Sequence, residues 1–510
     1  MIPRLQPKVS IPLPPAGFFQ RLIEAGFSGD IETGVASRTV FSTDNSIYQV
    51  EPTGILFPRA VEDLQVVAAV LSEPAFRGIS LAPRGGGTGT NGQSLTSGIV
   101  LDSSRHMTSV LEIDPVRRIA RVQAGVVKDQ LNRALKPHGL FFAPELSTSN
   151  RATIGGMIST DACGQGSCLY GKTSNHVLGL RIVLTDGSDF WSRPLDAETF
   201  EEIAARESRV GKIHRAVERI AREKHERIAE IFPKLNRYMT GYDLAHVRRG
   251  DGHFDLNAIL CGSEGTLAMI AEAELNLLPI PAHAALINIR YGDFNTALED
   301  ARNLVALKVA SVETVDEKVL GLAKGDIVWT GIARFFPDDP DSTTNGINIA
   351  EVLADDEEEL ERQLAEVTAA LDTGANARHS GYTIARGYAD VEAIWSMRKR
   401  AVGLLGNVEG PVRPVAFVED TAVPPENLAA YIREFRALLD GAGLSYGMFG
   451  HVDAGVLHVR PALDLTRADH VQLVREVSDA VVALTRKYGG VLWGEHGKGC
   501  LLYTSDAADE

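Results

Sequence analysis

Two short segments near the C-terminal end carry histidine and carboxylate side chains at spacings that suit metal binding. GHVDAGVLH places His451 and His458 seven residues apart, and GEHGKG adds Glu495 and His496. Seven residues put two side chains on opposite faces of one strand, whereas a turn at Asp453–Gly455 would return both to one side. Two histidines and a carboxylate form a three-ligand metal set that leaves positions open for substrate. A lone histidine is more often an ordinary core or surface residue. Two histidines together with a Glu-His pair in glycine-rich turns favour a functional site.

A second candidate for chemistry is the glycine-rich stretch PRGGGTGTNG, Pro83–Gly92. Gly87, Gly89 and the last glycine spell GxGxxG, but a dinucleotide fingerprint opens a helix and precedes an acidic residue by about 20 positions. Here QSLTSGIVLD predicts a turn and a strand, and Asp102 comes ten residues after the motif, so NAD is not expected. Successive glycines let backbone N–H groups converge on an anion. The stretch therefore predicts a phosphate cradle in preference to a plain surface loop.

Two further loops share this composition. They are PELSTSNRATIGGMISTDACGQGS (Pro144–Ser167) and CGSEGTL (Cys261–Leu267), both rich in Gly, Ser and Thr. Three such loops within one strand-rich region imply a long ligand laid along it, and a dinucleotide has that shape.

The elements that must position these residues fall into two patterns. Residues 51–280 show short apolar runs punctuated by glycine, which predict strands at 55–60, 79–83, 98–102, 118–125, 178–187 and 266–279. Helices are predicted at 61–73 and 127–139, and a charged helical insertion at 197–231. Residues 1–50 look like an N-terminal arm with a short helix near 17–25. After about residue 281, two strands alternate with each helix, at 294–308, 354–372 and 425–441, which predicts an antiparallel, ferredoxin-like α+β domain.

Composition narrows the class of protein. The chain has 510 residues, 44% apolar and 23% charged, so we expect two or three globular domains. Its net charge of −16 argues against general nucleic-acid binding. Four scattered cysteines without a CxxC pair favour a reducing cytoplasm and are too few to hold an iron–sulfur cluster here. We find no signal peptide and no run of the roughly 18 apolar residues that span a bilayer.

The three glycine-rich loops, taken in order, resemble the FAD-binding domain of the vanillyl-alcohol-oxidase/PCMH superfamily. The resemblance implies that Arg84–Gly92 wraps the FAD pyrophosphate, that Pro144–Gly164 follows the flavin and ribityl, and that Gly262–Leu267 closes the other side. The implied FAD-binding residues are Arg84, Gly85, Gly86, Gly87, Thr88, Gly89, Thr90, Asn91, Gly92, Pro144, Ser147, Thr148, Gly155, Gly156, Ser159, Thr160, Gly164, Gly262, Glu264 and Gly265. The implied organisation is an arm at 1–50, a PCMH-type FAD-binding domain at 51–280 and a substrate domain at 281–499.

The two histidine motifs resemble the C-terminal domain of FAD-linked D-2-hydroxyacid dehydrogenases. In that family an H…H…E set binds a divalent metal, commonly zinc, which implies metal ligands at His451, His458 and Glu495. The next residue, His496, would be the base near the flavin. The family often has Asn before Leu-His, where Val456 stands here, and this puts hydrogen-bonded support of the neighbouring histidine in doubt.

WSMRKRAVGLLG, at 395–406, resembles a helix of the same family. The match implies that Arg398 holds a substrate carboxylate through its bidentate fork, with Lys399 or Arg400 nearby. An RKR run alone would be a solvated helix face. Relatives with a lysine in a YKYD-like strand have no equivalent here, because Val418 stands at that position.

Nearly all of residues 1–499 resemble a subfamily of large bacterial enzymes that fuse this flavin half to an iron–sulfur half. TDNSIY, LNRYMTGYDL, SVETVD and VGLLGN carry the resemblance beside the histidine motifs. It implies a truncated N-terminal flavin half, with the iron–sulfur cluster only in the missing C-terminal half. LLYTSDAADE, at 501–510, continues no pattern, and we interpret it as a non-native tail in preference to a short disordered terminus.

The implied reaction is FAD-dependent oxidation of D-2-hydroxyglutarate to 2-oxoglutarate. The partners would be a small 2-hydroxy acid and a non-NAD electron acceptor, either the iron–sulfur domain or a quinone; a homo-oligomer stays open. Three alternatives remain: a D-lactate or glycolate dehydrogenase of the same family, an inactive flavin-binding fragment, and a metal hydrolase that uses the histidine set without flavin.

Overall fold

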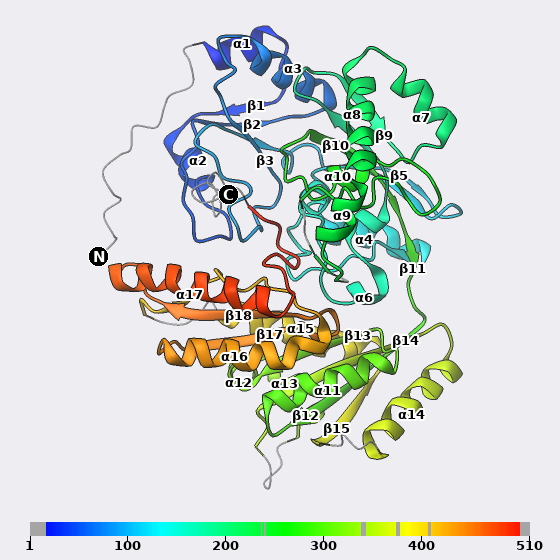
Figure 1. Ribbon diagram of the computed structural model, residues 1–510, viewed down its shortest axis with the longest axis vertical. Helices are drawn as coiled ribbons and strands as arrows, with labels where there is room; N and C mark the ends of the chain where they lie inside the picture. The colour runs from blue at the N-terminus through cyan, green and yellow to red at the C-terminus, as the bar shows by residue number, and fades with distance from the viewer. Residues whose placement is uncertain are drawn as a thin grey trace.

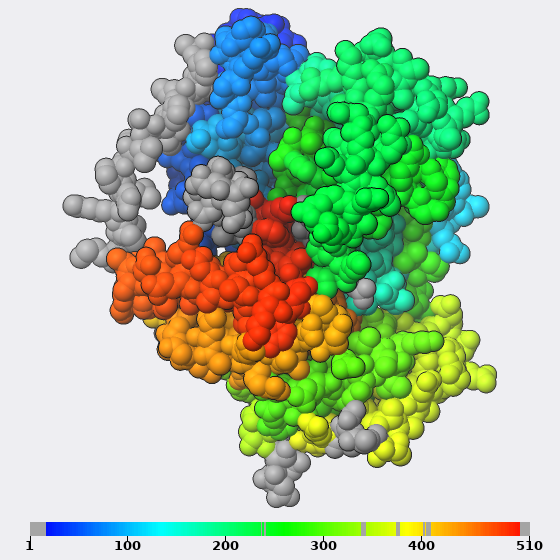
Figure 2. All heavy atoms as spheres, viewed as in Figure 1, coloured from blue at the N-terminus to red at the C-terminus, as the bar shows by residue number. Residues whose placement is uncertain are grey.

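The computed structural model describes residues 17–235, 237–238, 241–337, 343–373, 378–405 and 410–499. Figure 1 shows an upper part built from the blue-to-green first half of the chain and a lower part built from the green-to-red second half. In Figures 1 and 2 the red end of the described chain lies between the two parts. Cys500 and the predicted tail at 501–510 lie outside the described residues.

The first sheet of the upper part contains four strands in the order β1-β2-β4-β3. The strands are β1 (Asp30–Glu32), β2 (Gly54–Phe57), β3 (Leu81–Arg84) and β4 (Ile99–Asp102). β2, β4 and β3 run parallel and the strand segments GILF and IVLD are buried throughout, as in sheets that are covered on both faces. β1 pairs antiparallel with β2, so part of the predicted N-terminal arm is an edge strand of this sheet.

The second sheet is antiparallel, in the order β5-β6-β10-β8-β9. Its central strand β10 alternates buried and half-buried residues, which is the period of a strand with one face on the core. A two-stranded ladder, β11 with β7, leads out of it. These strands are β5 (Val110–Asp114), β6 (Ile119–Gln123), β7 (Leu140–Phe141), β8 (Val177–Val183), β9 (Asp189–Ser192), β10 (Met269–Asn276) and β11 (Leu278–Pro279).

Helices surround these sheets close to the predicted places. Three helices form in the segment predicted as a charged helical insertion, and two of them begin at side-chain caps from Asp196 and Ser208. The helices of this part are α1 (Phe18–Glu24), α2 (Val35–Val40), α3 (Val61–Ser72), α4 (Lys128–Leu135), α5 (Ile154–Ser159), α6 (Ser167–Tyr170), α7 (Ala197–Ala204), α8 (Arg209–Glu223), α9 (His225–Ile231) and α10 (Asn257–Leu260).

The lower part is a seven-stranded sheet in the order β15-β12-β14-β13-β17-β18-β16, with antiparallel pairing throughout. This confirms the predicted antiparallel α+β arrangement. The strands are β12 (His283–Tyr291), β13 (Ser311–Asp316), β14 (Gly346–Ala354), β15 (His379–Arg386), β16 (Arg413–Pro414), β17 (Tyr446–His451) and β18 (Val456–Leu463).

Helices cover both faces of this sheet. One core joins it to α11 (Phe294–Ala306), α14 (Glu357–Thr373), α16 (Leu428–Gly441) and α17 (Ala468–Lys487). The other joins it to α12 (Glu317–Lys324), α13 (Trp329–Ile332) and α15 (Tyr388–Leu405). Since alternate residues of a strand face opposite sides, odd-numbered residues of β12 enter the first core and even-numbered ones the second.

The histidine motif forms the predicted turn. β17 and β18 make a tight hairpin around residues 452–455, with Phe449 opposite His458 and His451 opposite Val456. Gly455 has φ +71°, and a Cβ there would lie 1.9 Å from the carbonyl oxygen of Val423, so only glycine fits. The hairpin returns both histidines to one face of the sheet.

The segment WGEHGKG forms no regular element within the described residues. After a single bridge between Val491 and Ala422, the chain runs as an irregular segment to residue 499. The reason is local hydrogen bonding: the Asp420 carboxylate accepts the backbone N–H groups of Glu495 and His496, both at 2.9 Å, in place of a neighbouring strand.

Candidate active site

A single continuous cavity extends from the glycine-rich loops of the upper part to the lower sheet. Of the residues predicted to bind FAD, those that line it are Arg84, Gly85, Gly86, Gly87, Thr88, Gly89, Thr90, Ser147, Thr148, Gly155, Gly156, Ser159, Thr160, Gly164 and Glu264. Those that lie off its lining are Asn91, Gly92, Pro144, Gly262 and Gly265. All the predicted metal and catalytic residues of the lower part line the same cavity: Arg398, His451, His458, Glu495 and His496.

The glycines of the first loop allow two loops to pack directly on each other. A Cβ on Gly85 would lie 2.1 Å from Thr153 Oγ1, and one on Gly86 would lie 2.3 Å from the Arg151 carbonyl oxygen. A side chain at either position would push the loop at 83–92 away from the loop at 144–164. At Gly85 and Gly86 the wall of the cavity is therefore main chain, because no side chain fits there.

The lining suits an anionic cofactor with hydroxyl groups. Buried Thr90 Oγ1 makes no hydrogen bond with any residue that the structure describes, and an unsatisfied hydroxyl facing a cavity is expected to bind a ligand atom. Arg84 also lines the cavity, although its guanidinium donates to the Thr43 carbonyl at 2.9 Å and stacks 5.0 Å from the Phe41 ring. These residues fit FAD.

The three predicted metal ligands meet below this wall. His458 Nε2 lies 2.7 Å from Glu495 Oε1, and His451 Nε2 lies 3.5 Å from the same oxygen. The three candidate ligand atoms all lie within 4.8 Å of one another and all three side chains are buried. A neutral imidazole pair with a carboxylate is a donor set that zinc and similar divalent ions prefer, so the residues fit a metal.

Hydrogen bonds behind the histidines fix the ring orientation. His451 Nδ1 donates to the Glu313 carboxylate, and His458 Nδ1 donates to the Glu419 carbonyl oxygen at 3.0 Å. Each ring therefore turns its Nε2 toward Glu495, as metal-binding histidines do. The sequence raised doubt about this support at Val456, but the partners come from other elements and do not involve that residue.

Electrostatics separate the roles of the cluster. Burial alone would raise the pKa of Glu495, but His451, Arg237 and His458 hold it well below its ordinary value. Burial lowers the pKa of His458, which favours the neutral ring that a metal requires. The pKa of His451 is raised, because Glu313 and Glu495 outweigh the effect of burial.

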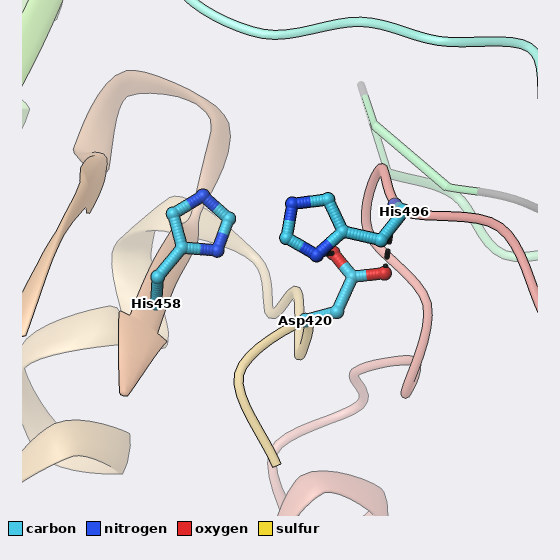
Figure 3. A group of neighbouring side chains, drawn as sticks. All are labelled: Asp420, His458 and His496. Carbon is cyan, nitrogen blue, oxygen red and sulfur yellow. Dashed lines mark hydrogen bonds and ion pairs between the residues drawn. The ribbon is translucent and has the colours of Figure 1, made fainter. Parts of the chain in front are cut away.

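His496 faces the metal cluster from the irregular segment. Its ring stacks on that of His458 with centroids 5.0 Å apart and an interplanar angle of 9° (Figure 3). Its Nε2 lies 3.4 Å from Glu495 Oε1 and its Nδ1 3.2 Å from Glu419 Oε1. Burial would lower the pKa of His496, but the nearby carboxylates of Asp420, Glu419 and Glu495 raise it well above the ordinary value.

Asp420, His458 and His496 form a second group that could hold an ion (Figure 3). It shares His458 with the first group, so the two describe one region. The Asp420 carboxylate already accepts two backbone N–H groups from the Glu495–His496 segment. This use of Asp420 favours His451, His458 and Glu495 as the ligand set.

Arg237 is a part of the site that sequence reasoning missed. Its side chain is 1% exposed and pairs with Glu495 Oε2, on the side of the carboxylate away from the histidines. Its Nε donates to Ser167 Oγ at 2.8 Å, and a terminal nitrogen donates to the Gly164 carbonyl. The upper part thus contributes a cation to the cluster of the lower part. Only its place in LNRYMTGYDL marked it in the sequence.

Two guanidinium groups flank Phe449 at the lower end of the cavity. The carbons of the Arg398 and Arg460 guanidinium groups lie 5.3 and 5.7 Å from the Phe449 ring centre. Arg398 Nη2 lies 2.6 Å from Glu313 Oε2. Arg460 was also missed, although the period of β18 places it on the same face as His458. Lys399 lines the cavity too, whereas Arg400 does not.

Comparison with known families accounts for both halves of this cavity. Residues 52–191 match the family model described as "FAD binding domain", and residues 280–501 match "FAD linked oxidases, C-terminal domain". This chain belongs to the FAD-linked oxidases. The oxidase uses FAD as its cofactor, and the alternative of a metal hydrolase without flavin loses its basis.

Relatives with high identity carry one name. The oxidase is 57% identical over 482 residues to "D-2-hydroxyglutarate dehydrogenase" of Pseudomonas putida, covering 94% of this chain and 48% of the relative. It is 51% identical over 503 residues to the protein of the same name from Escherichia coli, covering 98% and 49%. The chain therefore spans about half the length of the curated relatives it matches. The expected truncation stays a prediction. The matches do not support it, because they cover nearly the whole of this chain.

Solved structures with the same fold are much more distant in sequence. Alkyldihydroxyacetonephosphate synthase superposes with a TM-score of 0.67 at 15% identity, covering 93% of this chain and 80% of that one. 4-Ethylphenol oxidase from Gulosibacter chungangensis gives 0.63 at 13% identity, covering 94% and 89%. Within the described residues, the oxidase has no helix of the length and apolar character needed to cross a membrane.

Proposed function

We propose that this oxidase converts D-2-hydroxyglutarate to 2-oxoglutarate and passes the electrons from FAD to an acceptor other than NAD. The observation that carries the proposal is the shared cavity: the glycine loops, the histidine–carboxylate cluster and Arg398 line one continuous space. The choice of substrate is supported by the names of the relatives that are 57% and 51% identical to this chain.

The chain's own residues divide the work of binding and proton transfer. His451, His458 and Glu495 would hold a divalent metal, zinc by the chemistry of the donor set. When bound, the metal would act as a Lewis acid toward the oxygens at C1 and C2 of the substrate, and FAD would accept the hydride from C2. His496 Nε2, which faces the cluster, would take the hydroxyl proton, and the carboxylates around His496 would stabilise the resulting imidazolium.

Arg398 would bind the distal carboxylate of the substrate. Its Nη2 pairs with Glu313 Oε2 at 2.6 Å, whereas its buried Nε makes no hydrogen bond with any described residue. A buried guanidinium that lines the cavity with a donor to spare is suited to a carboxylate. A monocarboxylate such as D-lactate has nothing to offer it, so this residue would favour the five-carbon diacid.

The test is the visible spectrum of the purified, flavin-loaded protein under argon with four acids: D- and L-2-hydroxyglutarate, D-lactate and glycolate. We expect D-2-hydroxyglutarate to bleach the flavin fastest, and Arg398→Met to slow that reaction while leaving D-lactate unaffected. Faster bleaching by D-lactate or glycolate would overturn the choice of substrate. Flavin that no acid bleaches would favour the inactive fragment. Cytoplasmic location, oligomeric state and the iron–sulfur or quinone acceptor stay predictions.

A further inference from the structure

We propose that Asn91 and Gln93, at the tip of the first glycine loop, are positioning residues for the Glu495–His496 segment. The Asn91 side-chain amide donates to the Gly497 carbonyl oxygen at 2.6 Å. Gln93 Nε2 donates to the His496 carbonyl oxygen, also at 2.6 Å. Two adjacent carbonyls of the segment that carries a candidate metal ligand and the candidate base are thus held by a loop 400 residues earlier in the chain.

The contact between the loop and the segment is close and specific to glycine. Gly497 and Gly499 have φ of +77° and +70°, and a Cβ on Gly499 would lie 2.1 Å from the Asn91 carbonyl oxygen. The Glu264 carboxylate, from the third glycine-rich loop, accepts the Gly499 N–H at 3.1 Å and contacts Gln93 Nε2 at 3.4 Å. The segment therefore lies directly against both loops, held by the side chains of Asn91, Gln93 and Glu264.

The opposite side of the segment is fixed by the lower part. The Asp420 carboxylate accepts the N–H groups of Glu495 and His496, and its carbonyl oxygen accepts the N–H of Gly494 at 2.6 Å. The lower part thus holds the N–H groups of residues 494–496, whereas Asn91 and Gln93 hold the carbonyls of Gly497 and His496. Removing the two amides leaves these adjacent carbonyls without their donors.

This assignment changes the role that the family resemblance implied for Asn91. Its side chain is 9% exposed, lies off the cavity lining, and already uses an amide donor on Gly497. Arg84–Thr90 line the cofactor cavity, Asn91 lies off it, and Gln93 lies on its lining while its amide holds the His496 carbonyl. The inference rests on the proposed function, because it assigns Glu495 and His496 to the reaction.

Both amides are neutral, so the test separates an effect of position from an effect of charge. Their removal leaves the charge of the metal cluster unchanged, so a change in metal affinity or rate reports position and not electrostatics. Loss of a residue that orients a metal ligand typically lowers metal affinity about 10–100-fold. A misplacement of about 1 Å at a reacting group can lower the rate by about 100-fold.

The experiment compares Asn91→Ala and Gln93→Met with the wild type in the full chain. Asn132→Ala is the matched control, because the Asn132 amide also holds main chain, accepting the Phe142 N–H at 2.8 Å, but lies off the cavity lining. Asn91→Leu keeps roughly the size of the side chain and removes the donor without adding a charge, and it serves where Asn91→Ala fails to fold. Each protein is measured for flavin affinity, zinc affinity against a chelating dye, and the first-order rate of flavin bleaching by D-2-hydroxyglutarate.

We expect Asn91→Ala, at a residue off the cavity lining, to retain wild-type flavin affinity. We expect both variants to bind zinc about 10-fold or more weakly and to be bleached about 10–100-fold more slowly. A loss of flavin affinity with zinc binding intact would overturn the inference, because the two residues would then be cofactor contacts. Unchanged zinc affinity and rate would overturn it as well. If the wild type is not bleached, the proposed function fails, and zinc affinity still decides the role of these residues.

Hydrogen exchange at residues 494–499 decides the point without substrate or metal. Faster exchange there in Asn91→Ala and Gln93→Met, but not in Asn132→Ala, would support the inference. Exchange equal to that of the wild type would overturn it.

Discussion

The two ends of the cavity are built by opposite means. At the upper end, part of the wall is main chain, and positions such as Gly86 are glycine because a Cβ would meet the backbone of the next loop. At the lower end, the wall is side chain, and the buried groups Glu313 and Arg237 hold the candidate metal ligands His451 and Glu495. The upper end depends on positions without a Cβ, and the lower end depends on paired charges. Substitutions at the upper end should therefore weaken cofactor binding, and substitutions at the lower end should slow the reaction or lower the stability.

The largest effect should come from Glu495→Gln. The change removes the anionic oxygen that lies between His451 and His458. Metal-assisted charge stabilisation is worth several kcal/mol, so we expect flavin bleaching by D-2-hydroxyglutarate to slow at least about 100-fold while the flavin stays bound. Stopped-flow absorbance measures it, with Glu274→Gln, at a half-buried partner of Arg193 off the cavity lining, as the control. A Glu495→Gln protein that reacts at the wild-type rate would show that the lower end of the cavity takes no part in the reaction.

Arg237→Met should reduce stability strongly. It leaves the buried Glu495 carboxylate without its cation, and breaking a buried pair from one side typically costs about 3–5 kcal/mol. Urea unfolding, compared at the transition midpoint, measures the loss. Adding Glu495→Gln to this variant should recover part of it, since no charge then lacks its partner. A double variant no more stable than Arg237→Met would show that the pair is not what holds this interface.

Gly86→Ala should weaken cofactor binding and leave the metal cluster alone. The new Cβ would lie 2.3 Å from a backbone oxygen, and overpacking typically costs about 1–3 kcal/mol, so we expect flavin affinity to fall by roughly 10-fold. Gly78→Ala is the matched control, because a Cβ there meets nothing within 4 Å. Fluorescence titration of apoprotein with FAD measures both. Equal FAD affinity in the two variants would contradict the claim that close main-chain packing at Gly86 shapes the upper end of the cavity.

The smallest effect concerns a carboxyl group outside the cavity. Burial raises the pKa of Asp316 to about 7, although the N–H groups of Val319 and Met448 donate to it. The unfolded chain loses this proton near pH 4. The stabilisation by this group is therefore complete below about pH 4 and is lost as the pH rises through about 7. Asp316→Asn should gain in melting temperature relative to wild type between about pH 5 and about pH 8. A difference that does not change with pH would contradict the raised pKa.

Sequence reasoning succeeded where the signal is local. The strands and helices around the glycine loops, the hairpin that turns at Gly455 and the convergence of His451 with His458 follow from short patterns of residues, and the structure confirms them. The glycines that line the cavity were also predicted from local sequence, because the glycine-rich composition of each loop is visible without knowledge of the other loops.

The rest depends on contacts between distant segments. Arg237 and Asn91 act on Glu495 and Gly497, more than 250 residues later, and no local pattern reports such a pairing. Composition placed GEHGKG in a glycine-rich turn but indicated no partner for its N–H groups. The Asp420 carboxylate accepts two of them, and that contact is visible only in three dimensions.

The central claim is that the two ends of the cavity serve one reaction, and removal of the metal tests it most directly. The measurement is the rate at which D-2-hydroxyglutarate bleaches the flavin under argon, before chelation, after chelation, and after zinc is returned. The account predicts that chelation slows bleaching at least about 100-fold with the flavin still bound, and that zinc restores the rate. Bleaching at full rate in protein shown to be free of metal would contradict it.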